Sequence, residues 1–204
     1  AIGVYSTAVC FGLYYFNLGE SMEMNLTVFS FIGVVLSILL VFRTNNSYDR
    51  WWEGRKQWGA LVNHCRNLAV QIETTFPKDA MDEKRTLAKH ISNFCYAFKE
   101  HLRKGVDLDI LILLSDEEKA EYAEKSHIPN HISLQIHQEV YKMYQSKGFT
   151  DIDHLNIKIH TQALLDILGA CERIKKTPIP FSYSIFIKIF ILLYGILLPF
   201  AIFG

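Results

Sequence analysis

The sequence lacks the short motifs that identify the commonest enzyme classes. Its 204 residues contain no P-loop, no GxGxxG, no GxSxG and no HExxH, so phosphate-binding, dinucleotide-binding and common hydrolase chemistry have no recognisable site. The 4 cysteines form neither a CxxC pair nor an evenly spaced framework, which favours buried thiols in a reducing compartment over disulfides. We therefore expect a protein that is not an enzyme and has no cofactor.

Charge is almost absent from three stretches of the chain, roughly residues 1–18, 26–42 and 181–203. The chain has 21 basic and 21 acidic side chains, yet only Lys188, Glu20 and Glu23 lie outside 43–180. A bilayer core of about 30 Å needs about 17–25 helical residues, so these stretches are predicted to be membrane helices. The first stretch has no basic start and precedes another apolar stretch, which argues against a signal peptide. The chain begins without Met and ends within an apolar run, as a fragment of a longer protein would.

The flanks of these stretches predict their orientation. The loop at 17–25 carries two acids and no Lys or Arg, whereas Arg43, Arg50 and Arg55 follow the second stretch. By the positive-inside rule, residues 43–180 should lie in the cytoplasm and 17–25 outside. The predicted location is the inner (plasma) membrane of the cell, crossed several times.

The 43–180 region has apolar residues at three- and four-residue spacing, which is typical of helices. The second apolar stretch should continue as a helix to Pro77, and Asp79 or Asp82 should cap the next helix, which ends near 104–105. After a short apolar piece at 107–114, Ser115 and Glu118 form the capping-box pattern of another helix. The fold class predicted is therefore an all-α membrane protein whose membrane helices continue into a helical cytosolic region.

Two further helices and a non-helical link complete the prediction. Pro129 should separate the helix that begins at Ser115 from one at about 130–146, and the last helix should start at Thr150, Asp151 or Asp153 and end near 176. Pro178 and Pro180 cannot both lie inside a helix, so 177–180 should be a non-helical link to the third membrane helix.

One face of the second stretch carries Thr27, Phe31 and Val35, which are four residues apart. From spacing alone, this face packs against a neighbouring helix, and the small residues Gly33 and Ser37 would aid such packing.

The junction after the second stretch resembles a known family. The second stretch ends in a Phe-Arg-Thr-Asn run that begins at Phe42. It is followed by Tyr48, by Arg50-Trp51-Trp52-Glu53 and by Arg55, and then by Trp58-Gly59 and Asn63-His64-Cys65-Arg66. An Ile179-Pro180 step precedes the third stretch. This pattern is similar to the bestrophin family, and to its prokaryotic branch in particular. The residues that carry the resemblance are Arg43, Tyr48, Arg50, Trp51, Trp52, Glu53, Arg55, Asn63, His64, Arg66 and Ile179.

The resemblance implies a homopentameric ion channel with four membrane helices per subunit, of which the fourth would follow Gly204. It also implies that the second membrane helix lines an apolar neck. By register from Arg43, the neck residues are Thr27, Phe31 and Val35. A second constriction falls at Ile179, or at Thr177 if the register slips. The acidic cluster that binds calcium in animal members has no counterpart here, so no calcium site is expected.

The charged residues give opposing signals for ion selectivity. Rings of acids favour cations and rings of basic residues favour anions. Glu20 and Glu23 at the outer loop favour cations, whereas Arg43 and Arg50 lie at the inner end. Animal bestrophins conduct anions and a bacterial relative conducts cations, which leaves a slight lean to cations. The expected partners are further copies of the chain, the lipid bilayer and monovalent ions, with no nucleic acid.

Some polar residues have other interpretations. Pro129 breaks the helical register between His127 and His131, and His137 adds no tetrahedral set, so no metal site is expected. His64 and Arg66 could pair with Asp49 or Glu53. Lys188 should face a polar interior or reach the membrane surface.

The alternative function is a membrane-anchored sensor or enzyme with a cytosolic ligand site.

Overall fold

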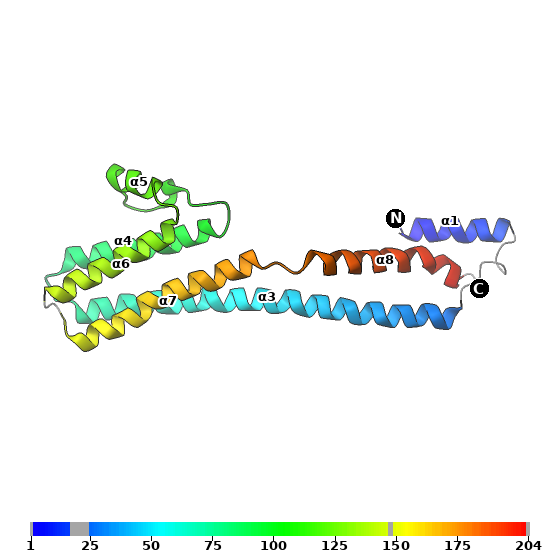
Figure 1. Ribbon diagram of the computed structural model, residues 1–204, viewed down its shortest axis with the longest axis horizontal. Helices are drawn as coiled ribbons and strands as arrows, with labels where there is room; N and C mark the ends of the chain where they lie inside the picture. Colours follow the sequence, from blue (N-terminus) through cyan, green and yellow to red (C-terminus); the bar gives the residue numbers. More distant parts are fainter. Residues whose placement is uncertain (1, 17–24, 147–148, 203–204) are drawn as a thin grey trace. The chain divides into compact units, whose positions relative to one another are not determined.

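The structure is a computed structural model that describes residues 2–16, 25–146 and 149–202. Over these residues the chain is helical, with no strand. The helices are α1 (Ile2–Tyr15), α3 (Leu26–Thr75), α4 (Met81–His101), α5 (Asp116–Ala123), α6 (Ile128–Gln145), α7 (Asp151–Lys176) and α8 (Phe181–Ile202), with a short 3-10 helix η1 (Leu108–Ile110) (Figure 1). The prediction of an all-α chain is confirmed.

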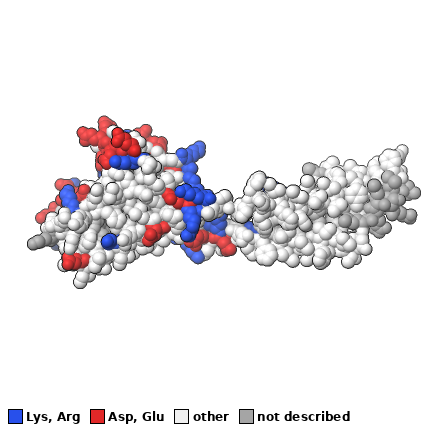
Figure 2. Space-filling view, viewed as in Figure 1, with Lys and Arg blue, Asp and Glu red and all other residues white. Residues whose placement is uncertain are grey.

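The chain divides into two compact units. Unit 1 contains residues 1–51 and 178–204, and unit 2 contains residues 52–177. The 50-residue helix α3 contributes its first half to unit 1 and its second half to unit 2. Figure 2 shows that Lys, Arg, Asp and Glu gather over the helices of unit 2, while the surface of α1 and α8 is almost free of charge.

In unit 1, α1 packs against α8. Two described helices, α3 and α8, are long and apolar enough to cross a membrane, whereas α1 is apolar but has 14 residues. The first half of α3 also contacts α8. Phe29 stacks on Tyr194 with ring centroids 4.4 Å apart, and the Tyr183 hydroxyl donates to the Leu39 carbonyl at 3.4 Å.

Unit 2 is a helical bundle in which α6 packs on both α4 and α7. Its core uses apolar side chains three to four residues apart, because that spacing puts them on one face of each helix. α4 contributes Leu87, Phe94 and Phe98, and α6 contributes Ile132 and Ile136, all fully buried. The second half of α3 enters the same core, mainly through Leu61, Leu68 and Ile72.

The starts of α5 and α7 follow local sequence signals, whereas the start of α4 does not. Ser115 and Glu118 form the expected capping box at the start of α5, and Thr150 and Asp153 form one at the start of α7. The prediction that Asp79 or Asp82 caps α4 is wrong. Ala80 occupies the cap position without a side-chain hydrogen bond, and Asp82 lies in the first turn.

The link at 177–180 is non-helical, as the two prolines require. Pro129 does separate two helices, but it does so from inside the first turn of α6, where its missing N–H costs nothing. α4 ends at His101, earlier than predicted, and Gly105 follows with a positive φ of 108° that suits glycine.

Candidate functional site

The predicted neck residues lie on a face of α3 that α8 leaves open. The packed face of α3 contains Phe29 and Leu36, which are 5% and 7% exposed, and Gly33, whose Cα lies close to the Tyr194 side chain. Each helical residue turns about 100°, so Phe31 lies roughly opposite Phe29, and it is 69% exposed. Thr27 shares this open face, and Val35 lies half-buried at its edge.

The open face continues along α3 as an almost wholly apolar surface. Val34 and Ile38 are 57% and 51% exposed, and both lie within about 60° of Phe31 around the helix. Ser37 lies on the flank, where its hydroxyl donates to the Gly33 carbonyl at 2.9 Å. A single chain therefore presents uncovered aliphatic and aromatic side chains here, with hydroxyl groups from Thr27 and Ser37 beside them.

The other residues predicted for the conduction path fall in different places. Ile179 is half-buried in the link before α8. The Thr177 hydroxyl donates to the Arg173 carbonyl at 2.6 Å, at the end of α7. Lys188 is exposed on α8. Glu20 and Glu23 lie outside the described residues.

The motif residues lie along consecutive turns of α3. Near the end of unit 1, Tyr48 and Trp51 have ring centroids 5.7 Å apart, Arg43 and Arg50 are half-buried, and Trp51 is exposed. In unit 2, Trp52 is exposed, and the Glu53 carboxylate accepts from the Gln57 amide at 2.8 Å.

Further along α3, one side of the helix forms a shallow hollow lined by Arg55, Trp58, Gly59, Val62 and Asn63. Trp58 stacks on Phe98 of α4 with centroids 5.2 Å apart, which fixes the indole at the edge of this hollow. Val62 is 44% exposed beside it. All of its lining residues come from α3, so the hollow has no opposing wall among the described residues.

His64 has a different partner from those suggested by the sequence. Its Nδ1 lies 2.9 Å from the Nδ1 of His160 on α7, and not against Asp49 or Glu53. Burial and the neighbouring His64 both lower the pKa of His160. Arg66 is exposed on the next turn of α3.

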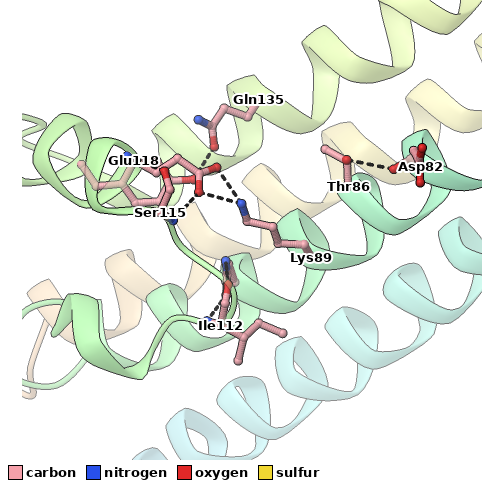
Figure 3. Close-up of polar contacts among 9 residues, drawn as sticks. Asp82, Thr86, Lys89, Ile112, Ser115, Glu118 and Gln135 are labelled. Atoms are coloured by element: carbon pink, nitrogen blue, oxygen red, sulfur yellow. Dashed lines mark hydrogen bonds and ion pairs between the residues drawn. The ribbon is translucent and has the colours of Figure 1, made fainter.

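A polar network fixes the segment between α4 and α6 (Figure 3). The Lys89 ammonium contacts both Glu118 oxygens, at 2.6 and 2.7 Å, and the Tyr122 hydroxyl donates to Gln135. Asn93 is fully buried and makes two bonds to the Ile112 backbone, at 2.9 and 2.7 Å. The Glu118 carboxylate therefore joins α5 to α4.

One cluster in unit 2 was not anticipated from the sequence. His127, instead of joining His131 or His137, meets His101 and Glu172, with both imidazole Nε2 atoms on the same Glu172 oxygen at 2.7 and 2.8 Å. His131 lies 3.2 Å from a Glu121 oxygen, and the His137 ring bonds the Ser133 carbonyl at 2.8 Å. The three clustered residues come from α4, α7 and the cap of α6, so no short sequence motif indicates the cluster.

Comparisons with known proteins agree with the resemblance. The model of the bacterial and fungal bestrophin family matches residues 1–204. A voltage-dependent anion channel-forming protein of Nostoc is 36% identical over 82% of this chain and 56% of its own length. The Escherichia coli protein YneE, which bears the same description, is 32% identical over 98% of this chain and 65% of its own length. The chain thus spans a little over half to about two thirds of these relatives.

A solved structure gives the same answer at the level of the fold. A mutant of a bacterial bestrophin homologue from Klebsiella pneumoniae superposes with a TM-score of 0.90 at 28% identity, over 98% of this chain and 75% of the homologue. The match of the family model over the whole chain and the similarity of these relatives lead to one conclusion: this protein belongs to the bacterial and fungal bestrophin family.

Proposed function

We propose that the protein is a passive ion channel in which the open face of α3 lines the pore. The observation that carries this proposal is the uncovered apolar face with Phe31 at its centre, opposite the face that packs on α8. Related proteins are named as anion channel-forming, which supports conduction of small ions. The channel would be a homopentamer in the inner membrane, with residues 43–180 in the cytoplasm.

In such an assembly the open face of each subunit meets its symmetry copies around one axis. Five copies of Thr27, Phe31 and Val35 then form a narrow apolar neck. A constriction of this kind stops ions by excluding water, so a small widening or rotation is enough to open it. Ile179, in the link before α8, forms the second constriction on the same path.

The neck assignment is tested by single-channel recording in planar bilayers. Replacing Phe31 by Ala widens the constriction and lowers the cost of wetting it, so open probability should rise several-fold. Leu40→Ala is the matched control, because Leu40 is also apolar and 38% exposed but lies on the opposite side of α3. Unchanged gating in Phe31→Ala, or an equal effect in Leu40→Ala, would rule out the neck assignment.

The ion carried is tested by the reversal potential of the full-length protein under a salt gradient. The names of the relatives favour anions, and the lean to cations that rested on Glu20 and Glu23 has no support from them. A reversal near the anion equilibrium potential would assign selectivity to the basic inner end. A reversal near the cation equilibrium potential would assign selectivity to Glu20 and Glu23 in the outer loop. Silence at all voltages would contradict the channel proposal.

A further inference from the structure

The cluster of His101, His127 and Glu172 has the geometry of a metal site. Their three potential ligand atoms all lie within 4.8 Å of one another, and the two imidazole rings have centroids 4.4 Å apart. Both Nε2 atoms point at one Glu172 oxygen, at 2.7 and 2.8 Å. A cation that replaced the two bridging protons would therefore find nitrogen and oxygen donors already converging.

The cluster is held by the fold and not by chance surface contact. Its side chains are only 21–28% exposed. His101 is the last residue of α4, and its carbonyl accepts from the Lys175 ammonium at 3.1 Å. His127 is the N-cap residue of α6, and its Nδ1 accepts from the Asn130 N–H at 3.2 Å. Each imidazole is thus fixed at a helix end against α7.

We propose that His101, His127 and Glu172 bind a divalent transition-metal ion of the zinc type, with water completing the coordination. Two imidazole nitrogens and one carboxylate oxygen suit Zn²⁺, which takes three protein ligands when one position is left open to water. Mg²⁺ and Ca²⁺ prefer sites made of oxygen atoms. This site is separate from the proposed pore face and does not depend on the channel proposal.

The proton balance of binding is defined by the hydrogen bonds. In the neutral His127 ring, Nδ1 accepts from Asn130, so the proton lies on Nε2 and is donated to Glu172. A metal takes the Nε2 lone pair of each imidazole, so the Nε2 proton of His101 and that of His127 both move to Nδ1. On His127 the new Nδ1 proton ends the 3.2 Å bond from the Asn130 N–H. Metal binding should therefore increase hydrogen exchange at the Asn130 amide.

A bound metal would also hold together the two ends of the segment between His101 and His127. His101 and His127 bracket the segment that contains η1 and α5, and Glu172 ties both ends to α7. A metal that links the two ends of a segment limits how far it can open. Zn²⁺ should therefore slow proteolytic cleavage between 102 and 126.

The test is a calorimetric titration of the metal-free full-length protein in detergent with Zn²⁺ alone, repeated with Co²⁺ while its visible absorption is recorded. We expect one ion per chain and the intense visible bands of tetrahedral Co²⁺. Glu172→Gln and His101→Ala should each weaken Zn²⁺ binding by at least about tenfold, since even an outer partner of a ligand contributes that much. His137→Ala is the control, because its ring bonds the carbonyl of Ser133 on its own helix.

Several results would overturn the proposal. They are absence of binding by the wild-type protein, equal binding by Glu172→Gln and wild type, and an equal loss in His137→Ala. Circular dichroism of each variant separates loss of the site from loss of the fold, and Glu172→Gln keeps the size and hydrogen-bonding ability of the side chain. Channel recordings are independent of every one of these readouts.

Discussion

At the scale of single residues, Glu118 is the one carboxylate of the run Asp116-Glu117-Glu118 that joins two helices. Its carboxylate is 27% exposed and contacts Lys89 at 2.6 Å, while the Ser115 N–H donates to it at 2.9 Å. Burial acts to raise the pKa of Glu118, but the Lys89 and Ser115 hydrogen bonds prevail and lower it. The charged form is therefore the one that the fold stabilises.

This arrangement predicts a pH dependence of stability. A lowered folded-state pKa contributes stability that is present above the unfolded value of about 4.3 and is lost as pH falls through the folded pKa. Glu118→Gln should cost about 1–3 kcal/mol of unfolding free energy at pH 7, and this difference should shrink below pH 4. Chemical unfolding in detergent at several pH values measures it.

The control for this experiment is the adjacent exposed residue, through Glu117→Gln. That variant should stay within about 0.5 kcal/mol of wild type at every pH. A difference between Glu118→Gln and wild type that is independent of pH would show that the charge of Glu118 is not what stabilises the contact.

The sequence predicted the caps at Ser115 and Thr150, but it did not predict the partners of Glu172. The Ser115 and Thr150 caps bond groups three residues away, so the local pattern contains the whole interaction. Glu172 bonds His101 and His127 across 71 and 45 residues. Those contacts exist only because α4, α6 and α7 pack together. The spacing of residues in the sequence does not indicate which helices pack.

At the scale of the helix, the close contact between α3 and α8 depends on one glycine. A Cβ added at Gly33 would lie 3.0 Å from the Tyr194 hydroxyl oxygen. The Tyr194 ring is also stacked on Phe29, so it cannot move away without losing that contact. The expectation that Gly33 aids helix packing thus has a specific partner in Tyr194.

Gly33→Val should therefore separate α3 from α8. Overpacking of this kind costs about 1–3 kcal/mol, and the expected result is a lower thermal unfolding temperature in detergent. Gly12→Val in α1 is the matched control, because a Cβ at Gly12 meets nothing within 4 Å. Equal stability of the two variants would contradict the contact.

The helices themselves were largely predictable, since continuous apolar runs and three- to four-residue spacing fix their type and approximate ends. The uninterrupted passage of α3 from unit 1 to unit 2 is consistent with the absence of Pro between 26 and 75. The start of α4 was misjudged because Asp79 and Asp82 flank the true cap, Ala80, whose side chain offers no signal.

At the scale of the whole molecule, the surface of α3 in unit 2 predicts an interface between copies. Val62 is 44% exposed beside Trp58, in the hollow whose described lining residues all belong to α3. If neighbouring subunits of a pentamer cover this hollow, Val62→Glu would bury an unpaired charge there. The assembly should then dissociate to smaller species, as measured by light scattering in detergent.

Ala88→Glu, at an exposed position on α4, is the control and should leave the proposed pentamer intact. A wild-type protein that runs as a monomer would contradict the pentamer itself. A Val62→Glu variant that remains pentameric would place the interface elsewhere. The sequence alone could not choose this surface, because an exposed apolar residue looks the same whether lipid, solvent or another subunit covers it.

The connection between α7 and α8 has a consequence for biosynthesis. Only residues 177–180 separate the two helices, and α7 supplies Leu164, Leu168 and Cys171 to the core of unit 2. That core cannot close until α7 has been made. At about 5–20 residues per second, the 22 residues of α8 follow within about 1–5 s. If α8 crosses the membrane as proposed, completion of the bundle and insertion of α8 therefore compete in time on the ribosome.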